Sequence, residues 1–179
     1  FACEREDVTP DLLCLGKGLT AGYLPMAATL TTDEIWQAFL GDYAESRTLY
    51  HGHTYGGNPL AAAVALASLD LFDAEQTLAN LQPKIERLAE HLERIAGHPH
   101  VGHVRQRGLI AGIELVQDRP SKQPYPWTEK RGQQVCDHAR TEGVWLRPLG
   151  NVVVIMPPLA ITRDELDTIC VAAERGIEM

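Results

Sequence analysis

Lys17 has a setting suited to covalent chemistry. It lies between Gly16 and Gly18, directly after an apolar run at residues 11–16 that is typical of a buried strand. The two glycines allow unusual backbone conformations and leave room for a bulky group beside the lysine. A lysine at the end of a strand can act as a Schiff-base nucleophile when its surroundings keep the amine neutral. The alternative is a solvated lysine in a glycine turn, and the spacing by itself favours that alternative.

Residues 51–59, HGHTYGGNP, combine hydroxyl, imidazole and glycine residues just before a helix start. Asn58 is a favourable N-cap, and Pro59 suits the first helical position. The free N–H groups and the positive dipole end of such a helix attract anions, phosphate among them. The alternative is a flexible loop before an ordinary capped helix.

Arg147 ends a predicted strand and is followed by Pro148. A guanidinium held by a rigid backbone suits bidentate binding of a carboxylate. One hydrogen bond to a charged group is worth about 1.5–3 kcal/mol. A surface ion pair is the alternative interpretation of Arg147.

We predict no metal site. His98, His100 and His103 lie close together in the sequence, but the neighbouring Pro99 and Gly102 indicate a surface connection rather than converging ligands. The four cysteines are too few for a disulfide framework, and none forms a C-x-x-C pair. Reduced thiols and a cytoplasmic location follow as expectations.

The apolar patterns and helix caps predict the elements that position these residues. A Thr-x-x-Glu box at Thr31 and Glu34 should open one helix, and a second box at Thr162 and Glu165 should open the last helix. The order is βαβ-like at the start, then a long helix, then a strand-rich α+β unit, with a boundary near residues 71–75. The expected strands are residues 11–16, 25–30, 101–105, 109–116, 144–147 and 152–156, and the expected helices cover residues 31–40, 59–72, 73–97 and 128–141 besides the last one.

Composition excludes several classes of protein. Of the 179 residues, 45% are hydrophobic and 22% are charged, which argues against disorder. The net charge of −8 and the absence of a basic block argue against binding to nucleic acid or to an anionic membrane surface. No apolar run approaches the roughly 18 residues of a membrane span, and no signal peptide opens the sequence. The first residue is Phe1, so we expect a fragment or a processed product.

Together these motifs resemble one family. The segment LCLGKGLT at residues 13–20, followed by GYLP, is similar to the lysine segment of the class III pyridoxal-phosphate (PLP) aminotransferases. The run HGHTYGGNPLAAA is similar to the phosphate-contacting loop of that family. Longer stretches, RQRGLIAGIEL and GVWLRPLGNVVVIMPPLAIT, follow in the family's order. The resemblance implies an α/β fold, the C-terminal part of a fold-type I PLP-dependent transferase. Residues 1–71 would end the large domain, and residues 72–179 would form the small α+β domain.

The resemblance also implies roles for individual residues. Lys17 would bind PLP covalently and later carry a proton between the substrate carbon and the cofactor. Thr54 would bind the PLP phosphate in the site of the partner subunit, so the enzyme would be a homodimer with shared active sites. His53 would lie at the cofactor, Gly52 would line the substrate channel, and Arg147 would bind the carboxylate of a keto-acid substrate.

The resemblance covers only the C-terminal part of the family's length. The aspartate that pairs with the pyridine nitrogen, the aromatic residue on the cofactor ring and a second phosphate loop lie upstream in the family. We therefore predict that these 179 residues alone are inactive. Two alternatives remain open, a class III aminotransferase for an ω-amino acid or amine, and a non-catalytic folded fragment that binds no cofactor.

Overall fold

The computed structural model describes residues 1–179, and the chain divides into two compact units, Phe1–Glu75 and Gln76–Met179. The helix α3 (Pro59–Ala74) belongs to the first unit and extends past residue 71, where the sequence predicted the end of the first domain. The assignment of residues 1–71 and 72–179 to two domains of a larger enzyme stays a prediction. None of the helices combines the length and the apolar character that crossing a membrane requires.

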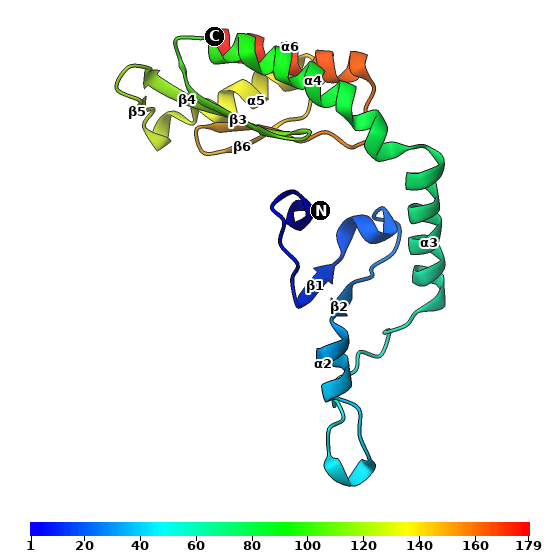
Figure 1. The fold of residues 1–179 in the computed structure, drawn as a ribbon. Helices are drawn as coiled ribbons and strands as arrows, with labels where there is room; N and C mark the ends of the chain where they lie inside the picture. Colours follow the sequence, from blue (N-terminus) through cyan, green and yellow to red (C-terminus); the bar gives the residue numbers. More distant parts are fainter. The chain divides into compact units, whose positions relative to one another are not determined.

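The first unit is built around a two-stranded antiparallel sheet (Figure 1). The sequence predicted a βαβ-like arrangement here, which is wrong, because Leu15 of one strand pairs with Ala28 of the other directly and in the antiparallel direction. A short 3₁₀ helix, η1, connects the strands and packs against α3. The remaining elements of this unit are α1 (Ala2–Arg5), β1 (Leu12–Leu15), η1 (Lys17–Thr20), β2 (Ala28–Thr31), α2 (Asp33–Ala38) and η2 (Tyr43–Glu45).

The helix caps of the first unit follow the sequence closely. Asn58 caps α3 by accepting a hydrogen bond from the N–H of Leu60, and Pro59 is the first helical residue, as predicted. The cap of α2 is Thr32 rather than the predicted Thr31. Thr31 is still part of β2, where it pairs with Leu12, so the helix begins one residue later than the spacing indicated.

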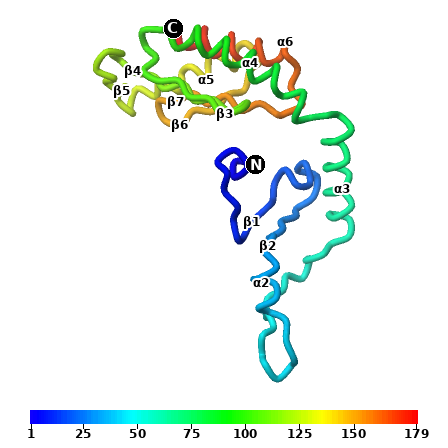
Figure 2. Tube along the Cα trace, viewed as in Figure 1, coloured from blue at the N-terminus to red at the C-terminus, as the bar shows by residue number.

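The second unit is an antiparallel sheet with strand order β3-β4-β7-β6, and a short fifth strand pairs with β4. Three helices lie on one face of this sheet (Figures 1 and 2). The last helix begins with the predicted box of Thr162 and Glu165. The elements are α4 (Thr77–Ala96), β3 (Val101–Arg107), β4 (Ile110–Asp118), β5 (Gln123–Pro124), η3 (Trp127–Glu129), α5 (Arg131–Thr141), β6 (Arg147–Leu149), β7 (Val152–Ile155) and α6 (Arg163–Glu178).

The strand that carries Arg147 differs from its prediction. The sequence placed a strand at residues 144–147, but β6 begins at Arg147 and includes Pro148 and Leu149. Arg147 therefore opens the strand instead of ending it. The pairing of Leu149 with Val152 sets this register, because the turn between β6 and β7 lies at residues 150–151.

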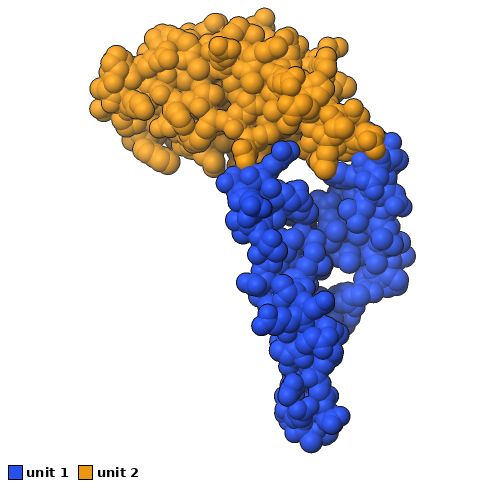
Figure 3. Space-filling view, viewed as in Figure 1, with its two compact units in different colours: residues 1–75 blue, residues 76–179 orange.

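The two units, drawn in different colours in Figure 3, differ sharply in how much apolar surface they bury. One continuous cluster of buried side chains, running from Leu88 to Ile177, fills the space between the sheet and the helices of the second unit. The first unit buries only four residues, and many large apolar residues there are exposed. The four are Thr20, Ala61, Ala65 and Ser68.

Candidate functional site

Lys17 opens η1 in an unusual backbone conformation. Its φ angle is +48°, in the left-handed region that a lysine rarely adopts, and Gly16 before it is fully extended. Such outliers gather at functional sites, where the surrounding structure maintains them. The side chain is exposed, and its amine forms no hydrogen bond or ion pair. The amine of Lys17 is therefore available to a ligand.

The turn that presents Lys17 is fixed from the opposite side. Thr20 is 1% exposed, and its hydroxyl donates to the carbonyl of Leu24. The N–H of Leu19 donates to the carbonyl of Gly16 at 3.2 Å, which closes the first turn of η1. Since η1 also packs against α3, the backbone at Lys17 has little freedom to move.

Lys17 lies in the wall of a cavity of about 1200 Å³ within the first unit. One side of this cavity comes from η1 and the chain up to β2, and the other comes from the loop before α3. None of the lining side chains is acidic. The lining residues are Lys17, Thr20, Gly22, Leu24–Ala27, His51, His53, Tyr55–Asn58 and Ala61.

The loop before α3 turns tightly at His53. The Nδ1 atom of His53 accepts from the N–H of Tyr55 at 3.2 Å, and its carbonyl accepts from the N–H of Gly56 at 2.8 Å. Gly57 has a φ of +70°, which a residue with a side chain rarely adopts. These bonds set His53 and Tyr55 in the cavity wall, directly before the N-terminus of α3.

The remaining predicted site residues lie elsewhere. Gly52 and Thr54 are exposed on the same loop but do not line the cavity of Lys17. Arg147 belongs to the second unit, where it opens β6 with an exposed side chain that has no hydrogen-bond or ion-pair partner. The structure thus brings Lys17 and His53 to one cavity of the first unit and leaves Gly52 and Thr54 out of its lining.

Sequence reasoning missed Thr20, Met26 and Tyr55 as lining residues. A signal for Thr20 was available, since it is a small hydroxyl residue three positions after the lysine. Met26 could not be found in this way, because its place depends on how the chain returns from η1 to β2.

The cavity has the chemistry of an anion site with a nucleophile. A primary amine, two imidazoles and a glycine-rich loop before a helix N-terminus line it, and no carboxylate opposes them. A helix N-terminus favours a phosphate, and a free lysine amine can condense with an aldehyde. A ligand that carries both groups fits this set of donors.

Comparison with known proteins identifies the family. Residues 1–177 match the aminotransferase class-III family, and the chain belongs to it. The predicted family and the α/β fold class are both confirmed.

Several similar relatives share one name. The chain is 55% identical over 177 residues to the adenosylmethionine-8-amino-7-oxononanoate aminotransferase of Geobacter sulfurreducens, covering 99% of this chain and 39% of the relative. It is 57% identical over 169 residues to the enzyme of that name from Nitratidesulfovibrio vulgaris, covering 94% of this chain and 31% of the relative. The chain therefore spans about two fifths or less of the length of these relatives.

Solved structures agree with this likeness. The crystal structure of the Methanocaldococcus jannaschii enzyme of the same name superposes with a TM-score of 0.93 at 48% identity, over 99% of this chain and 42% of that one. An amine transaminase from an uncultivated Pseudomonas species, in its PLP-bound form, superposes with a TM-score of 0.89 at 37% identity, over 99% and 40% of the two chains.

Proposed function

We propose that the protein containing this chain transfers an amino group to 8-amino-7-oxononanoate and so forms 7,8-diaminononanoate, a step of biotin biosynthesis. The observation that supports this most strongly is the identity of 48–57% to relatives named for this reaction, over nearly all of the chain. The proposed amino donor is S-adenosylmethionine, the compound in the name of those relatives. Lysine is the alternative donor.

The proposed cofactor is PLP, and the cavity of Lys17 fits it. PLP combines an aldehyde with a phosphate, which are the two groups that the lining donors suit. Lys17 would hold the aldehyde carbon, and His53 would lie at the cofactor. When bound, PLP supplies an electron sink for the negative charge that develops on the substrate carbon.

The residues of the chain would transfer the proton and bind the substrate. The amine of Lys17, which has no competing partner, would take the proton from the substrate carbon of the donor and return a proton to that of the acceptor. Gly52 would leave the substrate channel open, since a side chain is absent there. Arg147 would bind the carboxylate of the keto acid, so that the distal ketone is oriented toward the amine.

The proposed assembly is a homodimer with shared sites, in the cytoplasm, without nucleic-acid or membrane partners. Thr54 supports the shared site, because it is exposed on the loop yet does not line the cavity of its own Lys17. In the dimer, this hydroxyl would bind the phosphate of the cofactor at the other subunit's lysine.

A second candidate is amine or ω-amino acid transamination by the same cavity. The similarity to the Pseudomonas amine transaminase, at 37% identity, favours it. The two candidates differ in their acceptors, since 8-amino-7-oxononanoate carries its carboxylate at the far end of a long chain from its ketone, whereas short keto acids do not. A non-catalytic fragment is the third reading, and it predicts a folded chain without bound PLP.

Borohydride reduction followed by peptide mapping tests the proposal. In the whole protein loaded with PLP, we expect a pyridoxyl group on Lys17 and turnover of 8-amino-7-oxononanoate. An adduct only at another lysine would contradict the proposed catalytic residue, and preference for simple amines and short keto acids would favour the second candidate. The 179-residue chain alone, free of the rest of the protein, should show no turnover.

A further inference from the structure

The strand that carries Arg147 has little support from the sheet itself. β6 has three residues and lies at the edge of the sheet, so its only strand neighbour is β7. Pro148 occupies its middle position and has no N–H to donate to the ladder. A guanidinium that binds a carboxylate needs a fixed backbone, and this short edge strand has too few hydrogen bonds to fix Arg147 by itself.

Asn151, in the turn after β6, ties this hairpin to two other parts of the unit. Its side-chain amide donates to the carbonyl of Tyr125 at 2.7 Å. Its own carbonyl accepts from the N–H of Leu115, in the central strand β4, at 2.9 Å. The turn is therefore held from both sides, and its position follows that of Tyr125 and β4.

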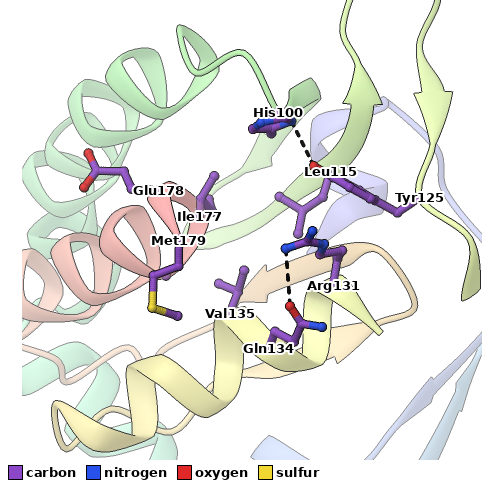
Figure 4. Close-up of a pocket in the computed structure, with 10 residues that line it drawn as sticks. His100, Leu115, Tyr125, Arg131, Gln134, Val135, Ile177, Glu178 and Met179 are labelled. Atoms are coloured by element: carbon purple, nitrogen blue, oxygen red, sulfur yellow. Dashed lines mark hydrogen bonds between the residues drawn. The ribbon is translucent and has the colours of Figure 1, made fainter. Parts of the chain in front are cut away.

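Tyr125 is a rigid anchor for this bond. It is 8% exposed, and its hydroxyl lies 2.8 Å from Nδ1 of His100. The guanidinium of Arg131 lies over its ring, 4.9 Å from the centroid. Figure 4 shows His100 and Arg131 on either side of Tyr125. Both contacts fix the ring of Tyr125, so its own carbonyl oxygen is a well-positioned acceptor for the side chain of Asn151.

Gly132 and Gly150 lock the same turn by close packing. A Cβ on Gly132, in the first turn of α5, would lie on the carbonyl oxygen of Gly150 and 3.1 Å from Pro148. Gly150 has a φ of +60°, and a Cβ there would come within 2.8 Å of the ring of Trp127. α5 can pack directly on the hairpin only because Gly132 lacks a side chain, and Trp127 of η3 can pack on the turn only because Gly150 lacks one.

We propose that Asn151 and Gly132 are positioning residues that hold Arg147 in place for the substrate carboxylate. Asn151 fixes the turn by hydrogen bonds, and Gly132 fixes it by allowing α5 to approach. This inference rests on the proposed function, in which Arg147 binds the keto acid. It adds that the affinity for that acceptor depends on a clamp whose members do not touch the substrate.

The test compares the two halves of the reaction in the whole PLP-loaded enzyme. Asn151→Ala and Gly132→Ala should each raise the KM for 8-amino-7-oxononanoate about tenfold, since small displacements of a binding group are costly. The rate of the half-reaction with S-adenosylmethionine should stay within about twofold of the parent enzyme, because the carboxylate of that donor adjoins the carbon that bears the reacting amine, whereas Arg147 is proposed to bind the carboxylate at the far end of the keto acid.

Two control variants carry similar lesions away from the hairpin. Gln106→Ala removes a side-chain bond to the carbonyl of Ile85, which is 3.0 Å long. Gly97→Ala places a Cβ 3.1 Å from the carbonyl oxygen of Arg94 and so crowds the end of α4. Both controls should lower stability but leave the KM for the acceptor within about twofold of the parent value.

Arg147→Gln shows whether the proposed role of Arg147 is wrong or only the positioning role of Asn151 and Gly132. If this variant leaves the KM for the acceptor unchanged, the proposed role of Arg147 fails and the inference fails with it. If it raises that KM while Asn151→Ala raises it no more than Gln106→Ala does, only the positioning role is overturned. If Gly132→Ala does not fold, the comparison of Asn151→Ala with Gln106→Ala still tests the positioning role.

Discussion

The Nε2 atom of His91 lies 2.6 Å from Oδ1 of Asp167, and this pair joins α4 to α6. His91 is 2% exposed. Its Nδ1 atom lies 2.7 Å from the guanidinium of Arg94, which can only donate. The proton of the neutral ring therefore belongs on Nε2, where it is donated to Asp167. Arg87 completes the cluster with two bonds to the same carboxylate, at 2.7 and 2.9 Å.

Replacing Asp167 should destabilise the second unit. The hydrogen bonds from Arg87 hold the pKa of Asp167 at about 2, below its ordinary value. A carboxyl whose pKa is lower when folded stabilises the protein above the unfolded pKa, and this contribution is lost as the pH falls from about 4 to about 2. Asp167→Asn should lower the free energy of unfolding by about 2 kcal/mol at pH 7. Urea unfolding at pH 7 and pH 3 measures both effects.

The matched control for this variant is Asp137→Asn. Asp137 is exposed on α5, where it pairs with Arg140 at 3.2 Å within one helix. Such a pair contributes about 0.5 kcal/mol, so the control should change stability little. Equal losses in both variants, or an Asp167→Asn loss that is as large at pH 3 as at pH 7, would contradict the role assigned to the Asp167 carboxylate.

The second unit should fold without the first. Its core is continuous and comes entirely from residues after Gln76, whereas only four of residues 1–75 are buried. Burial of apolar surface is the main driving force of folding, so the imbalance decides which part is stable. A fragment of residues 76–179 should unfold cooperatively in urea with helical circular dichroism. A fragment of residues 1–75 should show no cooperative transition, and a sharp transition there would contradict this reading.

The cysteines of the second unit offer an independent check of its packing. Burial raises the pKa of Cys136 to about 11 and that of Cys170 to about 12. The thiolate is the reactive form, so both thiols should be inert to a thiol reagent at pH 8 until the fragment of residues 76–179 unfolds. Glu178→Cys, which adds an exposed thiol on α6, is the positive control and should react at once. Rapid labelling of Cys136 or Cys170 in the folded fragment would contradict the structure.

The sequence was informative where local chemistry decides the structure. The Asn58-Pro59 start and the Thr162–Glu165 box were found because a cap needs only residues within one turn. The choice between Thr31 and Thr32 failed because β2 extends through Thr31 to pair with Leu12, a contact that the spacing does not contain. Local signals predict that a helix begins, and strand pairing decides where.

The candidate site was also predicted only where local residues determine it. Lys17 and the loop at residues 51–59 were recognised from their own residues, but their meeting in one cavity depends on the packing of η1 against α3. The strand of Arg147 was displaced because the turn at residues 150–151 sets its register with β7. The clamp of Asn151 on Tyr125 joins residues 26 positions apart, and no spacing pattern predicts it.

Complementation between inactive subunits tests the proposed shared site. Lys17→Ala removes the nucleophile, and Thr54→Val removes the phosphate-binding hydroxyl at nearly constant volume, so each homodimer should be inactive or nearly so. If Thr54 serves the partner's site, a mixed dimer contains one site with both residues intact. Random mixing of the two variants should then restore about a quarter of the parent activity.

The activity of the mixed dimer distinguishes a site shared between subunits from a site formed within one subunit. If Thr54 served the lysine of its own subunit, every site in the mixed dimer would carry one lesion, and mixing would restore nothing beyond the residual activity of Thr54→Val. A control mixture in which both subunits carry Lys17→Ala, one of them with Thr54→Val as well, should stay inactive under either arrangement. Activity is therefore regained only when the exposed Thr54, which does not line its own cavity, completes the site of the other subunit.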